Sequence, residues 1–393
     1  MSRAQLVEMA RKDLEHGRNG TLDQVDEIVR IPVENYYDQA RWEAEVQKVF
    51  RRIPLVLAAS AELPNPGDYK AMVAVGVQVL ITRNRQGTVK AFVNMCSHRG
   101  ARLVEEGKGT AHKFSCPYHA WTYSPDGDLV AIYSESDFGQ IDKSCHGLVE
   151  LPCLEKAGII WVTVNPQSTL DINLFLSGYD SLLEQFGFAN WTHQHTQTVQ
   201  GPNWKIAYDG YLDYYHLPIL HRNTFGTEIG NQANYYSWGP HTHLGRPDET
   251  LAEFADLPDE EWPIERLVNG VWTIFPHVSI ASFGGGGRSV MLSQLFPGDT
   301  PETSYTNQIF LMEQEPDTDQ LRKEAQEQFD FLKYVVQEED YATGIAQQKN
   351  LNVGARSHVM FGKNEGGGQA FHRWVDDILA ASDEDLPKLF QTG

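Results

Sequence analysis

The spacing of apolar and polar residues divides this chain of 393 residues into three parts. Residues 1–48 alternate acidic and basic groups around apolar positions at helical spacing, and the pattern is clearest in "DQARWEAEVQKVF" at the end of this part. This predicts short amphipathic helices. From about Ile53 apolar residues recur at every second position, which is typical of strands. After about Pro166 the two patterns mix, so we place the three parts at 1–48, 49–166 and 167–393.

The middle part, 49–166, is predicted to be a compact all-β unit. The run "YKAMVAVGVQVLITRNRQGTVKAFVNMC" predicts strands around a polar turn, "AWTYSPDGDLVAI" a hairpin with a Pro-Asp-Gly turn, and "GIIWVTVNP" a buried strand. The last part combines a helix starting near Trp204, strand-like runs such as "RSVMLSQLF" and "SYTNQIFLM", and a long helix from about Asp317. This order predicts an α+β domain, against which the N-terminal helices would pack.

Composition narrows the class of protein. Hydrophobic residues make up 41% of the chain and aromatic residues 11%, which fits a globular protein with an ample core. Against 53 acidic residues stand 32 basic ones, and a net charge of −21 would repel both nucleic acid and an anionic membrane surface. We expect no partner of either kind. No apolar run approaches the roughly 18 residues of a membrane span, and the charged start predicts a cytoplasmic protein.

Four cysteines are few for this length, which favours a reducing compartment over a disulfide scaffold. Two of them belong to a cluster of metal-binding residue types in the β part. In "CSHRG", Cys96 and His98 are one residue apart; seventeen residues later, in "CPYH", Cys116 and His119 are two apart. Gly100 and Pro117 accompany the two pairs, which fits two loops that close on one centre.

Two metal centres suit such a set. A structural zinc ion takes two cysteines and two histidines, but zinc fingers usually place their cysteines together and their histidines together. Here each loop supplies one of each. In a two-iron, two-sulfide cluster this allows both thiolates to hold one iron and both imidazoles the other, and the neutral imidazoles raise the reduction potential. The spacing favours the iron–sulfur cluster.

The motif C-x-H-x17-C-x2-H, followed by Trp121, resembles the Rieske motif of the large (alpha) subunits of Rieske non-haem iron oxygenases, the ring-hydroxylating family. The similarity extends through "ELPNPGDY", "AFVNMCSHRGARL" and "SPDGDLV" and covers most of the first 165 residues. The resemblance implies a Rieske [2Fe–2S] domain at 49–166 with Cys96, His98, Cys116 and His119 as cluster ligands.

A second cluster stands in "LDYYHLPILH", residues 212–221. Apolar residues at helical spacing predict a helix from "NWK" onward, and Asp213 then lies one turn before His216 on the same face. His221 is five positions after His216, a rotation of about 140° on an ideal helix. Pro218 is expected to loosen the helix just after His216 and let His221 turn back.

This segment resembles the mononuclear iron motif of the same family, D-x2-H-x4-H, although the family often has Glu-Asn where this chain has Asp209 and Gly210. The resemblance implies that His216 and His221 bind iron with a carboxylate from a late helix. In "FLKYVVQEEDYATGIAQQKNL", periodicity places Glu339 and Asp340 on opposite flanks of the apolar stripe and does not choose between them. The family pattern favours Asp340, which moves Asp213 out of the ligand set.

The resemblance further implies a catalytic domain of the helix-grip fold, an antiparallel sheet with a long helix, within 167–393. It implies a homotrimer, with or without small beta subunits, in which Asp213 bridges the mononuclear iron and the neighbouring cluster by reaching His119 of the partner subunit. Each chain would carry one [2Fe–2S] cluster and one mononuclear Fe(II). No flavin or nicotinamide site is evident in the sequence, so electrons from NAD(P)H must arrive through a separate reductase or ferredoxin.

The expected activity is hydroxylation, mono- or cis-dihydroxylation, of a small apolar substrate that is aromatic or cyclic, with dioxygen as the second substrate. Three alternatives stay open: an oxidative N- or O-demethylase of the same family, a Rieske electron carrier without oxygenase activity, and a zinc-stabilised binding protein. Residues 225–312 are expected to line the substrate pocket. Arg288 is a candidate for a substrate carboxylate, with a structural role preferred, and "HTH" at 241–243 fits a strand edge. A basic patch for the electron donor is a further hypothesis, drawn from Arg99, Arg102, Lys108 and Lys113.

Overall fold

A computed structural model describes residues 2–391 of the chain, and these form two compact units. Residues Phe50–Ile172 and Phe188–Asn190 make the first, which we call the β unit. The other described residues make the second, which we call the α+β unit. Along the chain, the main junctions lie at positions 49/50 and 172/173, where the sequence predicted boundaries at 48/49 and 166/167, and residues 188–190 return to the β unit.

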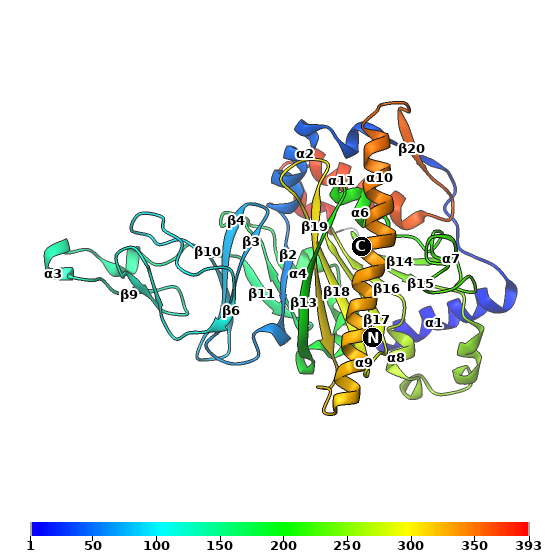
Figure 1. Ribbon diagram of the computed structural model, residues 1–393, viewed down its shortest axis with the longest axis horizontal. Helices are drawn as coiled ribbons and strands as arrows, with labels where there is room; N and C mark the ends of the chain where they lie inside the picture. The colour runs from blue at the N-terminus through cyan, green and yellow to red at the C-terminus, as the bar shows by residue number, and fades with distance from the viewer. Residues whose placement is uncertain (1, 392–393) are drawn as a thin grey trace. The chain divides into compact units, whose positions relative to one another are not determined.

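The β unit consists of three antiparallel sheets (Figure 1). The largest has the strand order β10-β5-β4-β3-β6, with β10 at Glu150–Leu151, β5 at Val89–Val93, β4 at Val77–Arg83, β3 at Asp68–Ala74 and β6 at Gly107–Thr110. A second sheet joins β11 (Cys153–Lys156), β12 (Ile159–Val162) and β2 (Leu55–Ala59), and a third joins β7 (Phe114–Ser115), β8 (Thr122–Tyr123) and β9 (Leu129–Ala131). The strands predicted from period-two spacing are therefore confirmed. Short helices α3 (Glu135–Phe138), η3 (Ser60–Glu62), η4 (Lys143–Cys145) and η6 (Phe188–Asn190) complete the unit.

A seven-stranded antiparallel sheet is the centre of the α+β unit. Its order is β13 (Thr192–Gly201), β19 (Ser304–Met312), β18 (Ser289–Pro297), β17 (Val278–Phe283), β16 (Val271–Ile274), β15 (His241–Gly245) and β14 (Asn234–Trp238). Strand β18 is buried along its whole length, because sheet neighbours flank it and other parts of the unit cover both of its faces. The predicted strands "RSVMLSQLF" and "SYTNQIFLM" are β18 and β19, which pair directly.

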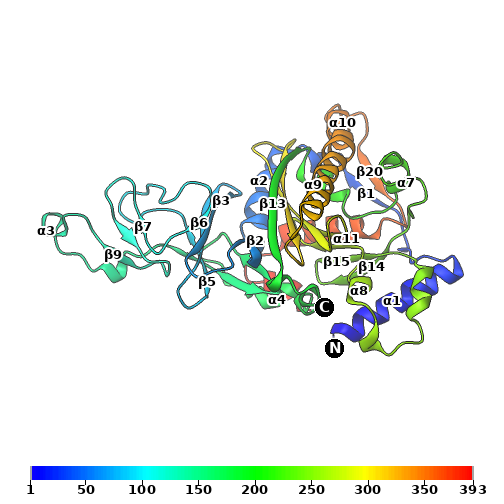
Figure 2. The same ribbon diagram turned by 60° about the horizontal axis from the view of Figure 1, so that its bottom comes forward.

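One long helical run crosses a face of this sheet (Figures 1 and 2). It comprises α9 (Asp319–Tyr334), the π-helical segment η9 (Val335–Tyr341) and α10 (Ala342–Leu351). Of the apolar stripe expected at Leu321, Ala325, Phe329, Leu332 and Val336, the last four residues are buried and Leu321 is half-buried. An antiparallel sheet gripped by a long helix, joined to an all-β domain, is the predicted fold class, and it is confirmed.

Residues 2–49 belong to the α+β unit. Helix α1 (Ser2–Asn19) and helix α2 (Gln39–Glu45) confirm the expectation of short amphipathic helices. A buried ion pair fixes α2, because the Lys205 ammonium contacts the Glu45 carboxylate and both side chains are fully buried. Arg41 shares the same carboxylate at 2.9 Å. This pairing ties the N-terminal segment to helix α6 (Trp204–Asp209), which precedes the second candidate site.

The α+β unit has further short elements. They are β1 (Val29–Pro32), which pairs with β20 (His358–Phe361), the helices α5 (Asp180–Leu183), α7 (Leu217–Leu220), α8 (Ile264–Leu267), α11 (Gly366–Ala380) and α12 (Leu386–Leu389), and the 3₁₀ helices η1 (Val33–Tyr36), η5 (Glu184–Phe186), η7 (Glu249–Phe254) and η8 (Asp259–Glu261). The π-helical η2 (Val46–Phe50) and helix α4 (Ile172–Leu176) span the junctions with the β unit along the chain. Within residues 2–391, no helix has both the length and the apolar character needed to cross a membrane.

Candidate metal centres and the adjoining cavity

Two loops of the β unit have the same hydrogen-bonding pattern. In the first, the Cys96 amide donates to the Ala101 carbonyl and the Gly100 amide to the Cys96 carbonyl, at 2.8 and 2.9 Å. In the second, the Cys116 amide donates to Trp121 O and the Ala120 amide to Cys116 O, again at 2.8 and 2.9 Å. The fourth residue after each cysteine has a positive φ, 78° at Gly100 and 57° at Ala120. Both loops therefore turn back sharply, with the cysteine at the same place in each turn and the histidine two or three residues later.

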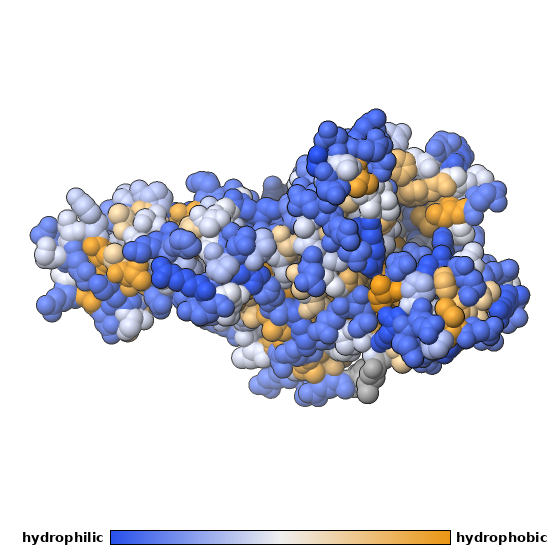
Figure 3. Space-filling model, turned by 90° about the horizontal axis from the view of Figure 1, so that it is seen from below, coloured by the Kyte–Doolittle hydropathy of each residue, from blue (hydrophilic) through white to orange (hydrophobic). Residues whose placement is uncertain are grey.

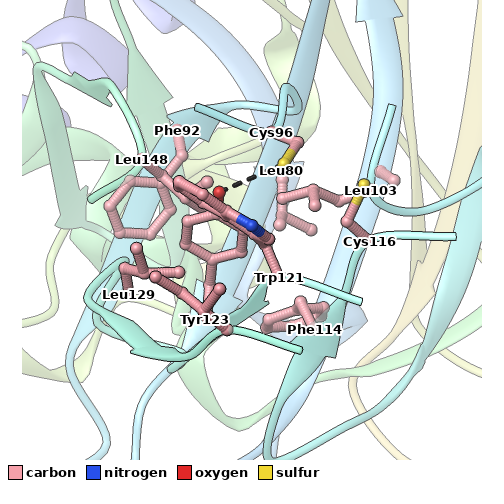
Figure 4. Packing of buried hydrophobic residues seen from close by; sticks show 12 residues of the cluster. Leu80, Phe92, Cys96, Leu103, Phe114, Cys116, Trp121, Tyr123, Leu129 and Leu148 are labelled. Atoms are coloured by element: carbon pink, nitrogen blue, oxygen red, sulfur yellow. Dashed lines mark hydrogen bonds between the residues drawn. The ribbon is translucent and has the colours of Figure 1, made fainter. Parts of the chain in front are cut away.

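The two thiols of these loops are buried and lie next to each other. Cys96 and Cys116 are 2% and 4% exposed, and they sit in an apolar cluster with the Tyr123 ring (Figure 4). Burial raises the pKa of the Cys96 thiol, and the neighbouring Cys116 thiol raises it further. The Tyr123 hydroxyl lies 3.2 Å from Cys96 Sγ. Two adjacent buried sulfurs with one hydrogen-bond donor suit a metal centre that binds both as thiolates.

The two imidazoles of the loops also meet. The ring centroids of His98 and His119 are 4.7 Å apart, and the His98 ring stacks on Trp121 at 4.8 Å. Nδ1 of each histidine is buried, and neither has a hydrogen-bond partner among the residues that the structure describes. Buried polar atoms are nearly always bonded, so two orphaned nitrogens side by side fit ligands of a metal. All four residues predicted for the first centre are thus brought together.

The second constellation is built differently from its sequence prediction. The helix starting near Trp204 was expected to carry Asp213 and His216 on one face, and this is wrong: α6 ends at Asp209, and Asp213 lies outside any helix. The chain turns at Gly210, a residue that weakens a helix. His216 and His221 instead flank the one-turn helix α7 as its two cap residues. Pro218 lies in the first turn of α7, where a missing amide costs little.

The structure brings His216, His221 and Asp340 to one point. One ligand atom of each lies within 4.8 Å of the others. Asp340 Oδ1 is 3.1 Å from His221 Nε2 and 3.8 Å from His216 Nε2. Two imidazoles and one carboxylate with room between them are a donor set that suits non-haem Fe(II).

A carboxylate also holds the other ring nitrogen of each histidine. Asp213 Oδ1 lies 3.0 Å from His216 Nδ1 and accepts a second bond from the His216 amide at 3.0 Å. Glu339 Oε2 lies 2.7 Å from His221 Nδ1 and accepts from the Thr224 hydroxyl at 2.8 Å. Such contacts fix the tautomer and the orientation of metal-binding histidines. From the sequence, Glu339 was considered only as an alternative to Asp340. The adjacent acidic pair indicates this site, but it does not reveal that both carboxylates reach the His221 ring.

An apolar cavity of about 280 Å³ opens beside this group. Its wall includes His216, His221 and Asp340 together with Phe225, Val271, Phe283 and Met291 from the predicted lining region, and Leu332, Val335 and Val336 from the long helix. Arg246, Asn269 and Ser282 add polar groups. The expectation that 225–312 lines a pocket holds for the segments after Phe225, around Arg246 and along β16 to β18, and the long helix completes the wall.

Several side candidates find structural roles. Arg288 pairs with Glu313 at 2.8 Å and lies over the Trp191 ring, so the preferred structural interpretation holds. His241 and His243 are buried and bind carbonyl oxygens, and burial lowers the pKa of each to about 4. They belong to β15, which is an interior strand and not a sheet edge.

Nearby acidic side chains reduce the positive charge of the basic patch that was suggested for an electron donor. Arg102 contacts Glu105 and lies 4.0 Å from Glu106, and Lys108 lies 3.7 Å from Glu62. Local acidic groups therefore offset two of the four proposed charges. Arg99 stacks on the Tyr118 ring at 5.3 Å and stays near the cluster loops.

Comparisons with known proteins agree with both constellations. Residues 54–143 match the family model of the Rieske [2Fe-2S] domain, and residues 188–381 match that of the ring hydroxylating alpha subunit (catalytic domain). The first match contains the four residues of the cluster loops, and the second contains His216, His221 and Asp340.

Among curated proteins, the anthranilate 1,2-dioxygenase large subunit of Acinetobacter baylyi is 29% identical over 211 residues, 51% of this chain and 44% of that protein. The matched stretch thus spans less than half of this relative. The carnitine monooxygenase oxygenase subunit of Escherichia coli K12 is 27% identical over 331 residues, 82% of this chain and 84% of that protein. The crystal structure of the quaternary ammonium Rieske monooxygenase CntA superposes with a TM-score of 0.75 at 21% identity, over 91% of this chain and 99% of that chain, which shows a shared fold.

Proposed function

Because the chain belongs to the large (alpha) subunits of the Rieske non-haem iron oxygenases, we propose that it is the terminal oxygenase component of a multicomponent enzyme. It uses dioxygen, and electrons relayed from NAD(P)H by a separate reductase or ferredoxin, to hydroxylate a small substrate. The observation that carries the proposal is the convergence of His216, His221 and Asp340 at the wall of an apolar cavity.

In this proposal, Cys96 and Cys116 hold one iron of the Rieske cluster, and His98 and His119 hold the other through Nδ1. The orphaned Nδ1 atoms and the adjacent thiols support this assignment. Cysteines that bind metal as thiolates and form no disulfide suit a reducing compartment such as the cytoplasm.

The mononuclear iron is held by Nε2 of His216, Nε2 of His221 and the Asp340 carboxylate. When bound, Fe(II) with three such ligands offers open positions at which dioxygen can be activated, with the cluster as the source of single electrons. Asp213 and Glu339 each accept the Nδ1 proton of one histidine, which leaves the lone pair of Nε2 for the metal. Most of the cavity wall beside this point is apolar.

We further place the chain in a homotrimer, with or without beta subunits, in which Asp213 bridges the two centres by reaching His119 of the partner subunit. Uncovered apolar residues support an interface on each unit. Tyr215 and Ile219, beside the iron site, are 56% and 71% exposed. At the end of the β unit that carries α3 and β9, hydrophobic residues gather on the surface (Figure 3), and Met95, Val130 and Phe138 are each more than 40% exposed.

The chemistry on the substrate has two candidates. Hydroxylation of an aromatic or cyclic compound fits the apolar cavity and the match to anthranilate dioxygenase. Oxidative N- or O-demethylation is the second, since the relative that covers 82% of the chain acts on carnitine, an N-methylated compound. The same iron site serves both.

Metal and acid-labile sulfide analysis of the purified chain tests the proposal. An oxygenase should contain about three irons and two sulfides per chain, a Rieske electron carrier two irons, and a zinc-stabilised protein zinc without sulfide. His216→Ala should lose one iron and keep both sulfides. Dioxygen uptake with a surrogate reductase then measures the oxygenase activity. A purified chain that holds only two irons would refute the oxygenase proposal.

A further inference from the structure

We propose that Arg246 binds the carboxylate of the substrate, so that the enzyme acts on a small organic acid and not on an uncharged hydrocarbon. The inference rests on the proposed function and adds the substrate class. It concerns the mouth of the 280 Å³ cavity, where Arg246 is an exposed wall residue.

Arg246 is the single lysine or arginine among the described residues of the cavity wall. Most of that wall is apolar, as Phe225, Val271, Phe283 and Leu332 illustrate. A lone cation beside an apolar chamber matches a molecule with one anionic group and an apolar body, since few but well-placed polar groups fix ligand orientation.

The guanidinium has no ion pair and no side-chain hydrogen bond to any other residue within 2–391. Asp13 and Asp248 line a small hollow on the other side of Arg246. Both are already engaged: Asp13 accepts bonds from Asn234 and Tyr236, and Asp248 pairs with Arg266 at 3.2 Å. Arg246 therefore keeps its five donors for a ligand, and a guanidinium matches a carboxylate with two parallel hydrogen bonds.

The charges of the cavity also set the direction of such a ligand. Its only other charged side chains among the described wall residues, histidines aside, are Asp213 and Asp340, which lie beside the two histidines of the iron site. These carboxylates repel an acid group, while Arg246 attracts it. The acid group is held at the mouth, and the apolar body extends towards the iron site.

Backbone constraints keep Arg246 in place. It directly follows β15 and precedes Pro247, whose ring fixes the local φ. Its neighbour Gly245 lies so close to Asp13 that an added Cβ would meet the carboxylate at 2.4 Å. These constraints fix the backbone from which the guanidinium extends.

The size of the cavity limits the acid. About 280 Å³ is at the lower end of ligand pockets, which span roughly 300–1,000 Å³. A single-ring acid or a short-chain acid fits. Two kinds of acid meet this limit. Benzoate represents acids with an uncharged ring, and glycine betaine represents short acids with a quaternary ammonium group.

Calorimetric titration of the purified holoprotein tests the proposal with benzoate, glycine betaine and the uncharged benzamide. We expect at least one acid to bind more tightly than benzamide. Arg246→Gln should weaken that acid about fivefold, the upper range for a solvent-exposed ion pair, and leave benzamide unchanged. Arg246→Lys should restore part of the affinity. Arg288→Gln is the matched control, because Arg288 pairs with Glu313 and is not part of the cavity wall.

The proposal is overturned if neither acid binds the wild-type protein more tightly than benzamide, or if Arg246→Gln and Arg288→Gln change acid binding equally. Iron and sulfide are measured on the same samples. A sample with three irons and two sulfides and no preference for acids refutes the substrate class alone. A sample without the third iron refutes the oxygenase proposal itself.

Discussion

His221 Nδ1 lies 2.7 Å from the Glu339 carboxylate, on the side of the ring opposite to Asp340. Two consecutive acidic residues thus hold one imidazole from both sides, with Nε2 at 3.1 Å from Asp340. The first acid orients the ring and the second completes the metal-binding group. Glu339 and Asp340 should therefore respond differently to substitution.

Asp340→Asn should remove the mononuclear iron, because it replaces the only carboxylate of the group. Glu339→Gln should keep that iron but weaken its binding about 10- to 100-fold, the usual cost of losing a partner of a metal-binding histidine. Iron and sulfide contents after dialysis against a chelator measure both effects. Glu338→Gln is the control, since within residues 2–391 the Glu338 side chain accepts a hydrogen bond from the neighbouring Gln337 and none from the iron site. Equal iron loss in the variants at 339 and 340 would contradict the assignment.

Asp213→Asn should retain the mononuclear iron and slow electron transfer between the centres. The Asp213 carboxylate accepts from both the amide and the ring of His216, and an amide side chain keeps one acceptor oxygen but no negative charge. Stopped-flow reoxidation of the reduced cluster measures the rate, with Glu365→Gln as a control from the same part of the unit. Loss of the iron in Asp213→Asn would return Asp213 to the ligands.

Tyr123→Phe should lower the reduction potential of the cluster by on the order of 20–60 mV. The Tyr123 hydroxyl lies 3.2 Å from Cys96 Sγ, and a hydrogen bond to sulfur stabilises the reduced, more negative cluster. The range follows from about 0.5–1.5 kcal/mol for one hydrogen bond in a one-electron couple. Spectroelectrochemical titration measures it. Tyr133→Phe is a control, because Tyr133 is 75% exposed; an equal shift there would show a nonspecific effect.

Stability should fall as the pH rises from about 4 to 7, because of Asp13. Burial raises the pKa of this carboxyl to about 6, so the folded chain binds the proton more tightly than the unfolded chain does. The stabilisation is complete below the unfolded pKa and is lost as pH passes the folded one; between pH 5 and 7 the loss is about 1 kcal/mol. Urea unfolding of Asp13→Asn should lack this component. The exposed Asp26→Asn should retain it, and unchanged pH dependence in Asp13→Asn would exclude Asp13 as the cause.

The sequence predicted the β unit well because its signals are local. Alternating apolar residues in 69–93 form β3, β4 and β5, and the residues after Cys96 and Cys116 close two matching loops. Each of these features depends on a few neighbouring residues. The metal-binding residue types therefore appear in the sequence at the spacing that the loops require.

Where distant segments meet, the sequence was less informative. Gly210 ends α6 early, a break that helical periodicity alone does not reveal. Periodicity also did not distinguish Glu339 from Asp340 as the ligand. It assumed the α-helical rotation of about 100° per residue, whereas this segment is π-helical and has more residues in each turn. Arg246 carries no local motif. Its relation to the iron site depends on the segment after β15 and the long helix, which line one cavity.

The π-helical segment Val335–Tyr341 also lets the long helix hold one extra residue without turning the residues that follow it. Beyond it, Gln348 of α10 accepts from the Asn203 amide and donates to the Tyr36 carbonyl, both at 3.0 Å. Closing these residues into a regular α-helix without removing one would turn Gln348 by about 100° away from both partners. Homologous chains with one residue fewer here are therefore expected to form a regular α-helix and still bring this glutamine to the same partners.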